Sequence, residues 1–246
     1  MKAMIFAAGI GSRLRPITDK MPKALVPVGG IPMLQRTLLR LKEAGFDEVT
    51  INIHHFGQQI IDFLHINNNF GIVIHISDER NELLDTGGGI LKAKSFLDGD
   101  EPFLVHNVDI LSNIDLRAVY DEHVASGADA TLLVSDRTTT RKLLFDKEMR
   151  LHGWLNHTSG EIKPEGFMYN PLHYRELAFE GIHIISPTVF REMDDGTPWQ
   201  GKFSIIPFYL SVCQKLCLRG HELKGITWFD IGKPETLQQA NEYYRR

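Results

Sequence analysis

The sequence has few cysteines and no long apolar segment. Its two thiols, Cys213 and Cys217, exclude a disulfide framework and a four-cysteine zinc site, and they favour a reducing compartment. No apolar run reaches the roughly 20 residues of a membrane helix. The short apolar run before Gly9 is followed at once by charged, proline-rich sequence, which does not fit a signal peptide. We therefore expect a cytoplasmic protein with no membrane partner.

The sequence also lacks an excess of positive charge, internal repeats and low-complexity tracts. Its 27 basic and 31 acidic residues leave a formal charge of −4, so we expect no nucleic-acid partner. The composition, 43% hydrophobic and 24% charged, is that of an ordinary globular protein. A chain of 246 residues can bury a full core. Its length favours one large domain, residues 1–246, over two.

Strand-like and helix-like segments alternate over residues 1–135. The expected strands are residues 2–7, 48–53, 72–76, 103–106 and 130–134, and the expected helices are 33–44, 58–64, 90–97 and 116–126. This alternation predicts an α/β fold with a doubly wound, mostly parallel sheet. A polar, turn-rich stretch follows and predicts a lobe inserted into the sheet, spanning 136–227 with its later strand 181–185 and helix 203–216. A terminal segment, 228–246, would end in a helix over 234–244.

A glycine-rich, basic stretch follows the first strand. Gly9 and Gly11 would let the backbone approach a ligand at the strand's carboxyl end, where successive N–H groups form an anion site. Four cations occur within eleven residues, which suits polyphosphate: Arg13, Arg15, Lys20 and Lys23. Leu14 replaces the third glycine of the dinucleotide fingerprint, and prolines follow, so neither that motif nor a P-loop is present.

The same stretch resembles a known family. Residues 9–16, Gly-Ile-Gly-Ser-Arg-Leu-Arg-Pro, and 22–28, Pro-Lys-Ala-Leu-Val-Pro-Val, look like the signature of sugar-1-phosphate nucleotidylyltransferases. The resemblance implies a Rossmann-like nucleotidyltransferase fold with a nucleotide-binding lobe over 1–135 and a sugar-binding lobe over 136–227. It implies that Arg13 supports the departing pyrophosphate and Lys23 contacts phosphates. The implied nucleotide-binding residues here are Ala8, Gly9, Gly11, Ser12, Arg13 and Lys23.

A second glycine-rich run, residues 85–90, reads Asp-Thr-Gly-Gly-Gly-Ile. Three glycines before a short helix would permit close backbone approach and leave helix N–H groups free, although a flexible helix entry is an equal alternative. The run resembles the family's second nucleotide-contact segment, with Gly88 against the nucleotide. It is most similar to that of N-acetylmuramate-1-phosphate uridylyltransferases, which implies UTP and N-acetylmuramic acid 1-phosphate as substrates.

Two carboxylates are candidate Mg²⁺ ligands. Asp109 ends a hydrophobic strand in the run 105–109, which resembles the family's Asn-Gly-Asp, with Asn107 contacting nucleotide and sugar. Asp230 lies in a run that resembles Trp-x-Asp-x-Gly-Thr-Pro and would be the second ligand; the alternative is a helix cap. Val108 and Lys233 replace the usual glycine and threonine. The valine leaves open whether the loop has an altered shape or an ordinary backbone.

Residues 179–182 resemble the family's sugar-contacting segment. Glu180 would accept hydrogen bonds from sugar hydroxyls and Gly181 would leave room for the ring; the alternative is a simple strand start. Lys163-Pro164 is loosely similar to a sugar-phosphate lysine of some relatives. The residues of the segment 136–178 are expected to decide which sugar is used.

The resemblance implies attack of a sugar phosphate oxygen on the α-phosphorus of a nucleoside triphosphate, with release of pyrophosphate. The open alternatives within the enzymes are mannose- or heptose-1-phosphate guanylyltransferase, glucose-1-phosphate thymidylyl- or uridylyltransferase, and choline-phosphate cytidylyltransferase. A catalytically silent nucleotide-sensing subunit is supported only by Val108 and Lys233. A Rossmann-type oxidoreductase is disfavoured by Leu14 and the prolines that follow it.

Overall fold

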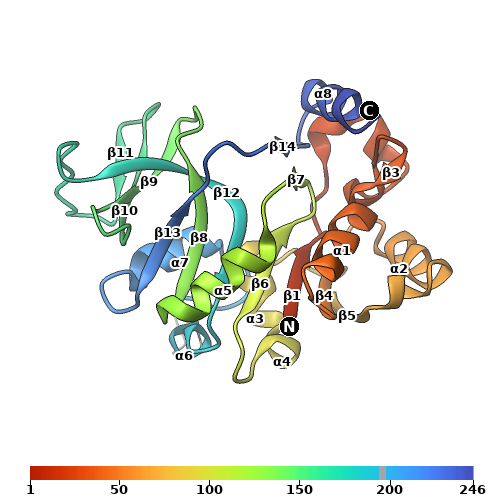
Figure 1. Cartoon of the computed structure of the whole chain (residues 1–246), viewed down its shortest axis with the longest axis horizontal. Helices are drawn as coiled ribbons and strands as arrows, with labels where there is room; N and C mark the ends of the chain where they lie inside the picture. Colours follow the sequence, from red (N-terminus) through yellow and green to blue (C-terminus); the bar gives the residue numbers. More distant parts are fainter. Residues whose placement is uncertain (194–197, 246) are drawn as a thin grey trace.

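One ten-stranded sheet runs through the protein (Figure 1). A computed structural model describes residues 1–193 and 198–245. Along the sheet the order is β11-β10-β9-β12-β6-β1-β4-β5, with β8 paired to β12 and to β13. The strands are β1 (Lys2–Phe6), β4 (Glu48–Ile53), β5 (Val73–Asp78), β6 (Phe103–Asn107), β8 (Ala130–Ser135), β9 (Arg141–Phe145), β10 (Leu151–Asn156), β11 (Glu161–Lys163), β12 (Arg175–Ile185) and β13 (Leu218–Glu222).

The sheet is mixed, which corrects the expectation of a mostly parallel one. Strands β6, β1, β4 and β5 are parallel, as the alternation predicts, and β13 is parallel to β8. Strand β12 is antiparallel to β6, β8 and β9, and the hairpins β9–β10 and β10–β11 are antiparallel. The chain returns from β8 to β12 through these hairpins without a crossover helix, and an antiparallel pairing is the one that such a return produces.

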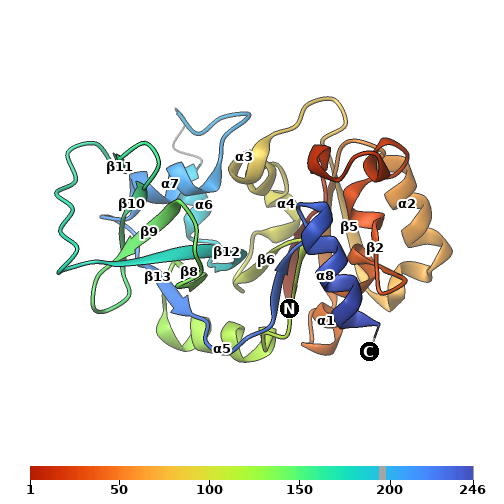
Figure 2. The ribbon, with the colours of Figure 1, turned by 90° about the horizontal axis from the view of Figure 1, so that it is seen from above.

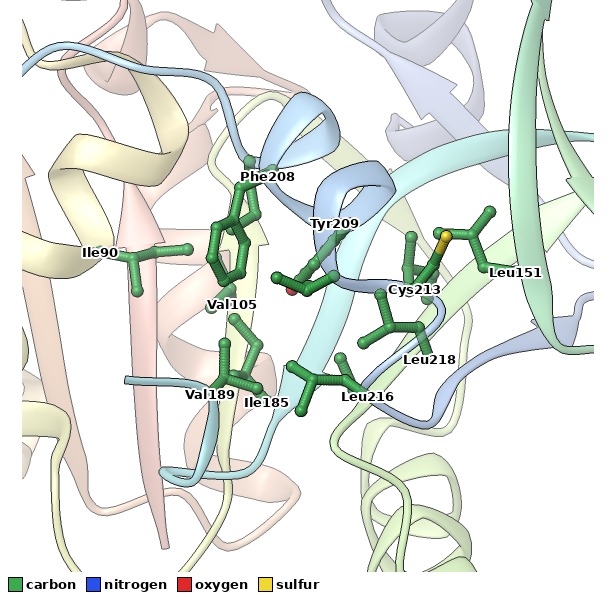
Figure 3. Close-up of a cluster of buried hydrophobic side chains, with 14 of the residues drawn as sticks. Ile90, Val105, Leu151, Ile185, Val189, Phe208, Tyr209, Cys213, Leu216 and Leu218 are labelled. Carbon is green, nitrogen blue, oxygen red and sulfur yellow. The ribbon is translucent and has the colours of Figure 1, made fainter. Parts of the chain in front are cut away.

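Helices cover both faces of the sheet, because neighbouring residues on a strand point to opposite faces. Met4, Phe103 and Val105 pack in one apolar cluster with α3 (Asp85–Lys92), α4 (Lys94–Leu97), α6 (Val189–Met193) and α7 (Ile205–Val212). Ala3 and Leu104 pack in the opposite cluster with α1 (Met33–Glu43), α2 (Gly57–Ile66) and α5 (Leu116–Ser126). Figure 3 shows the first cluster, with Phe208 and Tyr209 of α7 among the sheet side chains.

The inserted segment extends the sheet instead of interrupting it. Arg175–Leu177 pair with β9, while Ile182–Ile185 of the same strand pair with β6. The expected strand 181–185 is therefore the second half of an 11-residue strand. Since β12 belongs to both regions, the hairpins of the insertion stand at one end of a continuous sheet.

The terminal helix α8 (Pro234–Tyr244) lies against the glycine-rich loop and the small ribbon of β2 (Pro27–Val28) and β3 (Ile31–Pro32), as Figure 2 shows. Leu237 and Ala240 pack in a third apolar cluster with Leu14 and Val28. A two-stranded ribbon of β7 (Ile110–Ser112) and β14 (Trp228–Asp230) precedes α8. Among the described residues, no helix is long and apolar enough to cross a membrane.

Candidate active site

A cavity of about 490 Å³ opens where β1 and β6 end. This is the carboxyl edge of the parallel strands, where α/β sheets bind ligands. Eight predicted site residues line it: Ala8, Gly9, Gly11, Ser12, Arg13, Lys23, Asn107 and Asp109. Asn52, Leu83 and Lys202 also line it and were not predicted, and Asp85 and Thr86 come from the run 85–90, in which Gly88 was the predicted contact.

The glycine-rich loop folds as short 3-10 turns and not as a long helix, as its prolines predict. Gly11 has φ +68°, a left-handed conformation that favours glycine, and the Thr18 hydroxyl donates to its carbonyl at 2.9 Å. Leu14, at the position of the missing third glycine, is buried in the cluster under α8. The loop is thus anchored by an apolar side chain behind the cavity.

Two of the four loop cations reach the cavity. Arg13 and Lys23 line it, whereas Arg15 forms an exposed ion pair with Asp19 at 3.2 Å. Lys20 is exposed and does not line the cavity, so the predicted cluster of four cations supplies two to the site.

Lys23 and Asp109 form an ion pair between Nζ and Oδ2 at the base of the cavity. Only 10% of the lysine side chain is exposed, and this carboxylate is the partner that a buried ammonium group needs. Lys23 therefore already has one anionic partner, and a bound phosphate group would be its second.

Asp230 is brought beside Asp109 by the ribbon of β7 and β14. Asp230 pairs with Ile110, and the Ile231 N–H donates to the Asp109 carbonyl at 2.9 Å. Gly232 follows, and a Cβ there would lie 2.7 Å from Arg13 Nη2 and 2.9 Å from Asp230 Oδ1. The absence of a side chain at Gly232 lets the guanidinium and the carboxylate share one space.

The Asp230 carboxylate fits a cation. Its Oδ1 is buried without a hydrogen-bond partner among the described residues. Burial raises the pKa of Asp230, and repulsion by Asp109 raises it further, whereas Lys23, Arg13 and Arg137 lower it. A buried, unbonded carboxylate oxygen beside a second carboxylate is the oxygen donor set that Mg²⁺ uses together with water and substrate phosphates.

A buried hydrogen-bond chain fixes the start of the glycine-rich loop. Asn52 Oδ1 accepts from the Ala7 and Ala8 N–H groups at 2.7 and 3.3 Å, and its Nδ2 donates to Glu79 Oε1 at 2.8 Å. Glu79 is fully buried, and its other oxygen accepts from the Leu84 N–H at 3.1 Å. Asn52 and Glu79 are each a polar residue at or just after the end of an apolar strand, and this pattern could have identified them in the sequence.

The run 85–90 lies inside α3, which corrects the expectation of glycines preceding a helix. The Gly87 and Gly88 N–H groups are not free, because both donate to the Phe203 carbonyl, at 2.9 and 3.1 Å. A Cβ on Gly88 would lie 2.1 Å from the Gly201 carbonyl oxygen. Gly88 therefore packs against the segment before α7, and it is not among the residues that line the cavity.

The cavity face of this run is made by Asp85 and Thr86 instead. Asp85 has φ +62°, a left-handed conformation that is uncommon for a residue other than glycine. The Thr86 hydroxyl accepts from the Ile205 N–H at 2.9 Å, so it caps the first turn of α7. One short segment thus contacts the cavity on one side and the inserted region on the other.

The predicted sugar-contacting residues lie next to Asn107. Glu180 is 1% exposed, its Oε1 accepts from the Ser135 hydroxyl at 2.5 Å, and Arg137 Nε lies 3.2 Å away. Gly181 has φ +73°, and a Cβ there would lie 2.8 Å from Asn107 Nδ2, so the Asn107 side chain occupies the space over it.

The two departures from the family pattern leave the site intact. Val108 does not have a positive φ, so its backbone is ordinary. Its side chain is 4% exposed and packs in the apolar cluster that includes α1. Lys233 is exposed at the start of α8, where its N–H lies 3.4 Å from the Thr236 hydroxyl.

A second cavity, of about 360 Å³, lies between the inserted hairpins and α7. It adjoins the first one, because Thr86 Oγ1 on the first lies 3.4 Å from Ser204 Oγ on the second. Its residues combine cations with aromatic and aliphatic groups: Arg137, Thr139, Arg141, Leu143, Trp154, Lys163, Phe179, Ser204, Ile206, Pro207 and Leu210.

Known proteins share both the sequence and the fold. Residues 2–246 match the model of the family described as nucleotidyl transferase. The chain is 45% identical to an N-acetylmuramate alpha-1-phosphate uridylyltransferase of Neisseria meningitidis, over 98% of this chain and 96% of the relative. It is 30% identical to a protein of the same name from Caulobacter vibrioides, over 97% and 94%.

Among solved structures, a Bacillus anthracis chain provisionally assigned as a glucose-1-phosphate thymidylyltransferase superposes with a TM-score of 0.82. The two share 22% identity over 100% of this chain and 95% of that one, which supports the fold alone. The family match covers nearly the whole sequence, and the glycine-rich loop and Asp109 line one cavity, with Asp230 next to Asp109. The chain belongs to the nucleotidyl transferase family.

Proposed function

We propose that this sugar-1-phosphate nucleotidyltransferase joins UTP to N-acetylmuramic acid 1-phosphate, giving the UDP-sugar and pyrophosphate. The choice of substrates is supported by two full-length relatives of that name at 45% and 30% identity. The reaction is supported by one observation above all. Arg13, Lys23 and Asp109 line a single cavity at the sheet edge, and the Asp230 carboxylate lies beside Asp109 and Arg13.

The nucleotide would occupy the cavity of 490 Å³. The backbone from Ala8 to Ser12 would follow its phosphates, with Arg13 and Lys23 neutralising their charge. Gly88 would act on the nucleotide only through the position of Asp85 and Thr86, because its own N–H and Cα are enclosed. Lys202, exposed at the rim, is a further cation within reach of a triphosphate.

The reaction needs alignment and charge neutralisation more than covalent participation by the protein. A phosphate oxygen of the acceptor attacks the α-phosphorus in line, and the bond to the pyrophosphate oxygen breaks. Arg13 lies where it can hold the departing pyrophosphate, and Lys23 can hold the phosphate chain in register. Asp109 and Asp230 would hold Mg²⁺, which when bound neutralises phosphate oxygens.

The acceptor sugar would lie toward Asn107, Glu180 and Gly181. Both Glu180 oxygens have donors nearby, from Ser135 and Arg137. It would accept sugar hydroxyls only with its remaining lone pairs. Asn107, which lines the nucleotide cavity and lies next to Gly181, would contact both substrates.

The test is pyrophosphate release with Mg²⁺, in which UTP, GTP, CTP and dTTP are each combined with N-acetylmuramic acid, N-acetylglucosamine, glucose and mannose 1-phosphates and with phosphocholine. We expect UTP with N-acetylmuramic acid 1-phosphate to give the highest kcat/KM. A higher value for any other pair would replace the proposed substrates with that pair. No release with any pair, from folded protein that binds UTP, would contradict the enzymatic function.

A further inference from the structure

The cavity between the inserted hairpins and α7 carries a charge that the proposed reaction leaves unused. Its described lining residues include three cations and no carboxylate. Two of the cations have partners: Arg137 lies 3.2 Å from Glu180, and Lys163 Nζ lies 3.1 Å from Glu161. The Arg141 guanidinium makes no hydrogen bond or ion pair within residues 1–193 and 198–245.

Strand register places Arg141 on the face that forms the cavity. Leu143 pairs with Trp154, and Trp154 pairs with Lys163, so these three side chains share a face of the β9–β10–β11 sheet. Arg141 precedes Leu143 by two residues and therefore points to the same face. The guanidinium thus stands beside an aromatic wall at a cavity, unlike an arginine on an open surface.

The opposite wall is apolar. Ile206, Pro207 and Leu210 of α7 face the hairpins across the cavity. An unsubstituted hexose would leave this wall facing hydroxyl groups. A sugar with methyl-bearing substituents would cover this wall and be stabilised by the apolar surface it removes from water. The combination of an apolar wall with an unpaired guanidinium matches a substituent that carries both a methyl group and a carboxylate.

We propose that Arg141 selects an acidic acceptor by pairing with a carboxylate on a substituent of the sugar ring. The inference rests on the proposed function, because the 3-O-lactyl ether of N-acetylmuramic acid has both a methyl group and a carboxylate. Arg137 is unsuited to this role, since it is held by Glu180 and lies over the Trp228 ring at 4.6 Å. Arg141 can form the bidentate pair that guanidinium groups make with carboxylates.

The test compares three acceptors at saturating UTP: N-acetylmuramic acid 1-phosphate, its neutral lactyl amide and N-acetylglucosamine 1-phosphate. Arg141→Met should lower kcat/KM for the acidic acceptor about 10- to 100-fold, the range for a hydrogen bond to a charged group. Its effect on the two acceptors that lack the carboxylate should stay within about threefold, because neither forms the charged pair with Arg141. Arg141→Lys should recover part of the loss, and the KM for UTP should not change.

Lys147→Met is the matched control, because Lys147 is an exposed cation in the turn of the same hairpin. It should leave all three acceptors unchanged, and thermal unfolding should show that both variants are folded. Equal losses on the acidic acceptor and its amide would overturn the proposal, since Arg141 would then contact the phosphate or support the fold. Unchanged discrimination in Arg141→Met would overturn it as well.

Failure of the proposed function would look different. If the wild type rejected N-acetylmuramic acid 1-phosphate but used another acidic acceptor, such as glucuronic acid 1-phosphate, with the same dependence on Arg141, the inference would stand without that substrate. If the wild type used only sugar phosphates without a carboxylate, both proposals would fail.

Discussion

The two cavities of this protein are walled in different ways. The cavity proposed to hold the nucleotide is lined in part by the glycine-rich loop from Ala8 to Arg13, and the chain of Asn52 and Glu79 fixes the start of that loop from within the core. The second cavity, proposed to take the acidic substituent of the acceptor and called here the acceptor cavity, is lined by residues of the inserted hairpins and α7. As proposed, the first would hold groups common to every nucleoside triphosphate. In the second, Arg141→Met is expected to change the acceptor preference and to leave the fold in place.

The largest effect is expected from Asp109→Asn, which changes the first cavity and leaves the second untouched. The substitution keeps the size of the side chain but removes the charge beside Lys23 and Asp230. We expect kcat/KM to fall about 10³-fold, the loss typical of removing one preorganised charge-stabilising group. Pyrophosphate release measures it, with Asp121→Asn on the surface of α5 as the control. Activity within tenfold of the wild type would contradict the assignment of Asp109.

A pair of glycine variants separates the cavity from the packing behind it. Gly88→Ala forces a Cβ to within 2.1 Å of the Gly201 carbonyl oxygen, so the free energy of unfolding should fall by about 2–3 kcal/mol. A Cβ on Gly9 meets no atom within 4 Å. Gly9→Ala should keep its stability within about 0.5 kcal/mol and raise the KM for UTP. Chemical denaturation and kinetics measure both variants. A raised KM for UTP with unchanged stability in Gly88→Ala would contradict the prediction, because Gly88 would then serve the nucleotide directly.

The third prediction concerns pH and the core shared by both regions. Burial lowers the pKa of His183 to about 3, and its Nδ1 lies 2.8 Å from the Tyr209 hydroxyl of α7. Between pH 6.5 and about 3 the unfolded chain binds a proton that the folded one does not. Stability therefore falls with falling pH, by up to about 1.4 kcal/mol per pH unit from this residue.

Denaturant unfolding at pH 7, 6 and 5 checks this slope. In His183→Gln the protein should start less stable at pH 7 but lose less on acidification than the wild type. His65→Gln, at an exposed position on α2, is the control and should follow the wild-type slope. Parallel curves for His183→Gln and wild type would show that His183 is not the source of the slope.

The smallest effect is expected from Glu79→Gln. Glutamine has one acceptor oxygen in place of two, so either Asn52 Nδ2 or the Leu84 N–H loses its partner. We expect a loss of about 1 kcal/mol in the free energy of unfolding and a modest rise in the KM for UTP. Glu82→Gln, exposed three residues later, should change neither quantity. A rise in the KM for the acceptor, with the KM for UTP unchanged, would contradict the role of Glu79 in supporting the loop proposed to bind the nucleotide.

The sequence predicted the nucleotide cavity better than the acceptor cavity. The periodicity of residues 116–126 and 234–244 gave α5 and α8 with the observed bounds, because each is a self-contained amphipathic helix. The glycine-rich loop and Asp109 are local motifs at strand ends, and they meet at the cavity as expected. Their neighbour Asn52 was missed because it lies 44 residues or more along the chain from the loop that it holds.

The rest depended on contacts distant in sequence. The direction of β12 follows from its pairing with β6, β8 and β9, which no local pattern records. Strand β13, of mixed polarity, was not predicted at all, and the expected helix over 203–216 is limited to Ile205–Val212. The three glycines of α3 looked like a ligand loop, but Gly87 and Gly88 are explained by Phe203 and Gly201 packing on them.

Strand β12 has a mechanical consequence. It is hydrogen-bonded to β9 at one end, to β6 at the other and to β8 along both halves, so the regions that hold the two cavities share one sheet. The strand is irregular where they meet, because its register against β8 shifts between Phe179 and His183 and Gly181 between them has φ +73°. Opening them like a hinge would shear several backbone hydrogen bonds at once. Movements of loops and side chains at the mouths of the cavities would break fewer backbone hydrogen bonds than a rotation of one region against the other.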